Sequence, residues 1–138
     1  VASDIYMMTH TTNPLMSVAT IRAMLEQYSD GLENGKDSLF AVNAHQTRFY
    51  TADAAPINPD PDNLIRTQDL DPYLEENSLC YLFSRESFKA TNARIGKAPL
   101  MYATPKLESV DIDEKPDWFM AESLLLRVAA GETLPTEN

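Results

Sequence analysis

The chain has 138 residues, enough for one domain with a real core and too few for two ordinary ones. Its hydrophobic content of 43% and charged content of 23% are typical of a globular domain, and no apolar run approaches the length of a membrane span. The net charge of −10 argues against nucleic acid or an anionic membrane as a partner. The single cysteine, Cys80, excludes an internal disulfide and favours a reducing, cytoplasmic location. Because Cys80 lies in an apolar run, we expect a core residue rather than a nucleophile.

The first third of the chain predicts a strand, a helix and a second strand. Residues 4–9 form an apolar strand, and Ser17 is a candidate N-cap for a helix. Gly31 and Gly35 mark the end of that helix, and residues 38–42 form the next strand. This order indicates a right-handed βαβ unit in a parallel sheet. The helix is predicted from apolar residues at helical spacing, namely Val18, Ile21, Met24, Leu25 and Tyr28.

The rest of the chain mixes short elements with one long loop. Residues 48–50 are a candidate strand, and the proline-rich loop after them is long enough to cover a site or make a subunit contact. Further strands are expected at 79–83, 99–103 and 107–112, with a short helix from Ser84. A C-terminal helix begins at Pro116, a favoured first-turn proline. Its predicted core face comprises Trp118, Ala121, Leu125 and Val128.

Two carboxylates near the end of the last predicted strand indicate a metal site. In an extended strand Asp111 and Asp113 would share one face, with Cα atoms about 6.6 Å apart. Their mutual repulsion is relieved by a hard cation such as Mg²⁺, which is typically held by one or two carboxylates and substrate phosphates. The motif thus favours metal-dependent chemistry on a phosphate compound. The alternative is that Asp113 only caps the following helix.

Five blocks in register resemble one protein family. They are THTTNPL at 9–15, IRTQDL at 65–70, EENS at 75–78, RIG at 94–96 and VDID at 110–113. Together they resemble the sugar cytidylyltransferases, specifically the acylneuraminate (CMP-sialic acid synthetase-like) branch. The resemblance implies an α/β fold with a mixed, mostly parallel Rossmann-like sheet and flanking helices, incomplete at its N-terminus. It also implies Mg²⁺-dependent transfer of CMP from CTP to an acidic nine-carbon sugar, with release of pyrophosphate.

The resemblance also implies site residues. Asp111 and Asp113 correspond to the catalytic metal site. The acceptor sugar would contact the first loop and the IRTQDL and EENS blocks, through His10, Thr12, Asn13, Arg66, Gln68 and Asn77. Arginine binds carboxylates in a bidentate fashion, so Arg66 is the first choice for the sugar carboxylate. Two departures leave the identity of the sugar open, because relatives commonly have Gln at the position of His10 and a second Arg at that of Thr67.

One family feature is missing from this sequence. The family's glycine- and lysine-rich CTP loop has no counterpart, because all four glycines come after residue 30. We therefore expect residues 1–138 to form a single partial nucleotidyltransferase domain, the later part of a longer protein, with a dimerisation or substrate-covering insertion around 44–78. An exposed strand edge favours a homodimer. The alternatives are a non-catalytic sugar-binding module, a structural dimerisation subunit, or an enzyme whose nucleotide-binding part is a separate chain.

Overall fold

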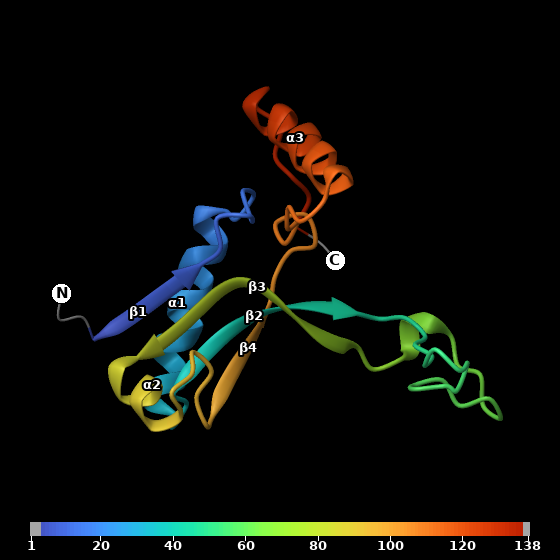
Figure 1. Cartoon of the computed structure of the whole chain (residues 1–138), viewed down its shortest axis with the longest axis horizontal. Helices are drawn as coiled ribbons and strands as arrows, with labels where there is room; N and C mark the ends of the chain where they lie inside the picture. Colours follow the sequence, from blue (N-terminus) through green and yellow to red (C-terminus); the bar gives the residue numbers. More distant parts are fainter. Residues whose placement is uncertain (1–3, 137–138) are drawn as a thin grey trace. The chain divides into compact units, whose positions relative to one another are not determined.

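The computed structural model describes residues 4–136, which divide into two compact units (Figure 1). The larger unit comprises the described residues up to 43 and those from 76 onward, and the smaller comprises residues 44–75. No helix in the described part of the chain is long and apolar enough to cross a membrane. The elements in chain order are β1 (Ile5–Thr9), α1 (Val18–Glu33), β2 (Ser38–His45), a 3₁₀ turn (Thr67–Asp69), β3 (Tyr73–Ser84), α2 (Arg85–Thr91), β4 (Pro99–Ala103) and α3 (Lys115–Ala129).

The four strands form one mixed sheet in the order β1-β3-β2-β4. The pair β1 and β3 is antiparallel, with Thr9 opposite Cys80, whereas β2 and β4 are parallel, with Ser38 opposite Pro99. The predicted α/β class with flanking helices is confirmed, but the predicted majority of parallel pairs is wrong, because the sheet is mostly antiparallel. The physical reason is that β3 lies between β1 and β2, so the two strands joined through α1 are not neighbours (Figure 1).

Helix α1 begins where the sequence predicts. The Ser17 hydroxyl accepts a hydrogen bond from the Thr20 backbone N–H at 3.1 Å, which caps the helix. Met24 and Tyr28, one turn apart, are fully buried against the sheet. The helix ends at Glu33, and Gly35 then adopts a φ of 74°, a left-handed conformation that glycine accommodates without strain.

The core of the larger unit is built on β3. Cys80 is fully buried, which confirms its prediction as a core residue, and burial raises the pKa of its thiol to about 11. A thiol with that pKa is protonated at neutral pH and is a poor nucleophile. The buried cluster joins α1, β2 and β3 through Met24, Tyr28, Leu39, Ala41, Leu79, Cys80 and Leu82.

Two predicted strands are absent from the described residues. Tyr50 makes only an isolated bridge to Pro56, and residues 107–112 form turns and irregular chain. The strands predicted at 79–83 and 99–103 are confirmed as part of β3 and as β4. The helix predicted from Ser84 is confirmed as α2, with Ser84 as its N-cap.

Helix α3 carries its predicted first-turn proline, but its predicted core face is mostly wrong. Only Ala121 of that face is buried, whereas Trp118 is 60% exposed and Leu125 and Val128 are also exposed. The apolar residues of this helix are not confined to one side, since Phe119 and Leu126 lie on another side and are exposed as well. Periodicity therefore could not select one face, and Leu125 and Val128 of the predicted face line a cavity together with residues 14–19.

Asp37 fastens the start of β2 to the start of β4. Its carboxylate accepts hydrogen bonds from the backbone N–H groups of Lys97 at 2.7 Å and Ala98 at 3.1 Å, and from the Ser38 hydroxyl at 3.0 Å. A Cβ at Gly96 would collide with this carboxylate, so the close approach requires glycine. Partial burial works to raise the pKa of Asp37, but these hydrogen bonds outweigh it and lower the pKa below its ordinary value of 3.8.

Replacement of Met24 by alanine should strongly destabilise the fold. The Met24 side chain is fully buried, with 0% exposure to solvent. Met24→Ala should therefore cost about 2–5 kcal/mol of unfolding free energy. The matched control is Leu25→Ala, because Leu25 follows in the same helix and is 39% exposed. Urea unfolding followed by circular dichroism measures both. Equal losses for the two variants would contradict the burial of Met24 in the core.

Replacement of Asp37 by asparagine should reduce stability in a pH-dependent way. Since the folded-state pKa is lowered, the carboxylate stabilises the fold above about pH 4, and this stabilisation disappears as the pH falls through the folded-state pKa. Asp37→Asn should therefore cost about 1–2 kcal/mol at pH 7 and progressively less toward pH 3. Asp30→Asn, at an exposed position of α1, is the control. A loss that is constant from pH 7 to pH 3 would contradict this account.

Candidate functional site

The loop that follows β1 lies beside the segment that precedes α3. The Ile112 backbone N–H donates a hydrogen bond to the Thr12 carbonyl at 3.0 Å. The Asn13 amide Nδ2 donates to the Val110 carbonyl at 3.3 Å. Two blocks that lie far apart in the sequence, 9–15 and 110–113, are therefore held together in the larger unit.

Two buried oxygens mark this junction. Within residues 4–136, Asn13 Oδ1 and Asp111 Oδ1 are the buried side-chain polar atoms that have no hydrogen-bond partner. Leaving a buried acceptor unpaired costs about 1–3 kcal/mol, more for a charged group. Such atoms in a folded protein call for an explanation, and a bound ion or ligand is one of the recognised ones. The junction is therefore the candidate functional site.

Buried side chains fix both segments to the start of α1. Glu108 is only 5% exposed, and its Oε2 accepts a hydrogen bond from the Ser17 backbone N–H at 2.9 Å. Leu15, between the loop and the helix cap, is also buried. The loop is thus attached at Thr12, Asn13 and Ser17 to one continuous stretch of chain, which limits the movement of the unpaired oxygens.

The donor atoms suit a hard cation. Amide and carboxylate oxygens are the ligands that Mg²⁺ and Ca²⁺ prefer, so Asn13 and Asp111 fit the predicted Mg²⁺ by chemistry. Asp113 is exposed and follows two residues later. The described residues contain no group of three or more His, Cys, Asp or Glu side chains that could by themselves hold a metal ion. A cation here would therefore rely on these few oxygens together with water or substrate, as is common for Mg²⁺.

The strand geometry predicted for the two aspartates is wrong. Residues 110–113 are irregular, so the shared face expected for Asp111 and Asp113 does not follow from a strand. Asp113 is also not the cap of α3, because the N-cap is Glu114, which forms a capping box with Asp117. The Asp117 carboxylate accepts from the backbone N–H groups of Glu114 at 2.8 Å and Asp113 at 3.2 Å. The side chain of Asp113 is thus not needed to begin the helix.

His10 lies beside an aromatic and charged group on the same unit. Its ring centroid is 6.4 Å from that of Tyr81, and the Arg94 guanidinium lies 4.0 Å from the Tyr81 ring centroid. Arg94 Nη2 also contacts Glu76 Oε1 at 3.3 Å, and the Tyr81 hydroxyl donates to the same oxygen. The pKa of Tyr81 is raised, chiefly by burial and in addition by its hydrogen bond to Glu76. Sequence reasoning missed this group, although Arg94 lies in one of the five blocks.

Asn77 is used inside the fold. Its Nδ2 donates to Asn43 Oδ1 at 2.9 Å and to Thr104 Oγ1 at 2.7 Å, and its Oδ1 accepts from the Leu79 backbone N–H at 3.1 Å. The residue is buried. These bonds tie β3 to β2 and to the end of β4, which is a structural role; the predicted sugar contact of Asn77 stays a prediction.

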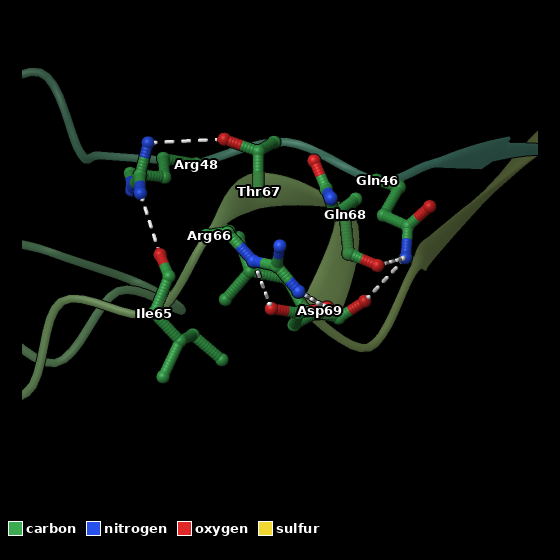
Figure 2. Close-up of polar contacts among 8 residues, drawn as sticks. Gln46, Arg48, Ile65, Arg66, Thr67, Gln68 and Asp69 are labelled. Carbon is green, nitrogen blue, oxygen red and sulfur yellow. Dashed lines mark hydrogen bonds and ion pairs between the residues drawn. The ribbon is translucent and has the colours of Figure 1, made fainter.

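The predicted carboxylate-binding Arg66 belongs to the smaller unit. Its guanidinium is paired with Asp69, with Nε to Oδ2 at 2.8 Å and Nη2 to Oδ1 at 3.2 Å (Figure 2). The Arg66 side chain is 73% exposed, so its ion pair with Asp69 contributes little to stability. A substrate carboxylate could therefore compete with Asp69 for the Arg66 guanidinium. The Gln68 side chain is exposed on the same turn.

Two side chains hold the IRTQDL block in place (Figure 2). Gln46 Nε2 donates to the Gln68 carbonyl at 2.8 Å and to the Leu70 carbonyl at 2.9 Å. Arg48 donates to Thr67 Oγ1 at 3.0 Å and to the Ile65 carbonyl at 2.6 Å. Thr67 thus accepts a hydrogen bond from an arginine that lies elsewhere in the chain.

No protein-family model matches the chain, and no curated protein matches it significantly. The family resemblance therefore stays a prediction. Of the predicted site residues, the structure brings Thr12, Asn13 and Asp111 into one hydrogen-bonded junction. His10 belongs to the same loop, and its ring faces the Tyr81 group.

Proposed function

We propose that this chain supplies the acceptor-sugar and metal-binding part of a cytidylyltransferase that acts on an acidic nine-carbon sugar. In this proposal the junction of the first loop and residues 110–113 binds Mg²⁺, and CMP passes from CTP to the sugar with release of pyrophosphate. The observation that supports it best is the pair of buried, unpartnered oxygens at Asn13 and Asp111. They lie in two of the five blocks on which the resemblance rests.

The chemistry asks little of the protein beyond positioning and charge. Phosphoryl-type transfer depends on aligning the attacking hydroxyl and neutralising charge on the transferring phosphate. Bound Mg²⁺ supplies that neutralisation and orients phosphate oxygens. In the proposal Asn13 and Asp111 hold the cation, and Asp113 assists from its exposed position.

The sugar carboxylate needs a cation of its own. Arg66 is suited to it because its guanidinium already binds a carboxylate, that of Asp69, through two hydrogen bonds. The proposal therefore has the substrate replace Asp69 on Arg66. Gln68, on the same turn, would contact a sugar hydroxyl.

A second candidate function is sugar binding without catalysis. The glycines of this sequence, at positions 31, 35, 96 and 131, are scattered and form no glycine-rich phosphate loop. A chain with an acceptor site and no such loop would bind the sugar and leave CTP unbound. Titration with Mg²⁺ separates the two, because only the cytidylyltransferase proposal requires this chain to bind the metal.

Mg²⁺ should stabilise the chain through Asp111. At a concentration ten times its dissociation constant, Mg²⁺ should add about 1.4 kcal/mol to the unfolding free energy and raise Tm by a few degrees. Asp111→Asn should abolish the shift, whereas Asp62→Asn, at an exposed position of the smaller unit, should retain it. In NMR spectra, Mn²⁺ should broaden the amide signals of residues 12–13 and 110–113 first. Broadening elsewhere, or an unchanged shift in Asp111→Asn, would refute the metal site.

Two variants of one ion pair should change sugar affinity in opposite directions. Arg66→Ala should weaken N-acetylneuraminate binding at least tenfold, because it removes the cation. Asp69→Asn should strengthen binding, because it frees the Arg66 guanidinium from its present partner. Calorimetric titration measures both, with N-acetylmannosamine as a neutral sugar that should not distinguish the variants. Equal affinity in wild type and Arg66→Ala would remove Arg66 from the site.

A further inference from the structure

An aromatic groove lies on the larger unit, away from the candidate metal site. Its walls include Tyr6 from β1, Phe83 from β3 and Phe88 from α2, around a cavity of about 560 Å³. The Tyr6 and Phe83 rings are stacked with centroids 5.9 Å apart, and those of Phe83 and Phe88 are 5.7 Å apart. Tyr6 is near the start of β1, whereas the loop with Asn13 follows its end. The two sites are therefore separate.

Two cations line the same groove. Arg85 and Lys89, one turn apart on α2, are the other lining residues, and both are exposed. Arg85 Nη2 donates to the Tyr6 hydroxyl at 3.0 Å, which places its guanidinium at the rim of the aromatic floor. Among residues 4–136 no acidic side chain lines the groove, although Glu86 lies on the same helix. On a chain with a net charge of −10, this is a local basic site.

The combination of rings and cations defines the ligand that would fit. Aromatic side chains stack on planar rings, and arginine and lysine bind phosphate or carboxylate. The cavity volume lies within the usual range for small-molecule sites. A nucleic-acid strand is disfavoured, since the overall negative charge repels a polyanion. We propose that this groove binds an aromatic anion of mononucleotide size, with its ring on Phe83 and Phe88 and its anionic group on Arg85 and Lys89.

The test compares three probes by NMR titration of the full chain. AMP carries both ring and phosphate, adenosine carries only the ring, and inorganic phosphate carries only the anion. AMP should shift the amide signals of residues 6, 83, 85, 88 and 89, and should bind at least tenfold more tightly than adenosine or phosphate. Asp111→Asn should leave AMP binding unchanged, which separates this groove from the proposed metal site.

Two variants should each weaken AMP binding at least tenfold by different routes. Arg85→Ala removes the charge, and Phe88→Leu removes the ring at a position that is already 41% exposed, so both variants should fold. Arg22→Ala, at an exposed position of α1, is the charge-matched control and should bind AMP normally. The proposal is overturned if AMP fails to bind at 5 mM, if adenosine or phosphate binds as well as AMP, or if either groove variant retains wild-type affinity.

Discussion

The arrangement of the larger unit depends on β3 lying in the middle of the sheet. This strand pairs with β1 on one side and β2 on the other, and its residues Leu79, Cys80 and Leu82 are fully buried. Because Cys80 is opposite Thr9, the pairing fixes where β1 ends and where the following loop begins. The same strand carries Asn77, whose amide joins β2 and Thr104. Loss of this strand's register would displace both segments of the candidate site.

The two unpaired oxygens of the candidate site lower the stability of the fold, and the hydrogen bonds around them keep them in place. Unpaired buried oxygens destabilise a fold, so they persist only where the surrounding structure holds them in place. Here the backbone bond from Ile112 to Thr12 and the carboxylate of Glu108 at Ser17 hold the two segments. A site built this way is already organised in the free protein, which would lower the entropy lost on binding any ligand.

Local signals in the sequence predicted local structure well. Ser17 and Ser84 cap their helices and Pro116 lies in the first turn of α3, because capping involves only residues a few positions apart. Strand order was not predictable in this way, since the insertion of β3 depends on contacts between distant segments. Residues 107–112 alternate like a strand, but no described strand pairs with them. Arg66 was singled out for its chemistry, but its pairing with Asp69, three residues later, was not predicted.

The exposure of α3 decides how this protein can be followed in solution. Trp118 is the only tryptophan in the chain and is 60% exposed on that helix. Its fluorescence will therefore resemble that of a water-exposed indole even in the native state, and will change little when the core around β3 melts. The same property makes it a sensitive reporter of anything that covers α3, because a blue shift of its emission would record that event without any label.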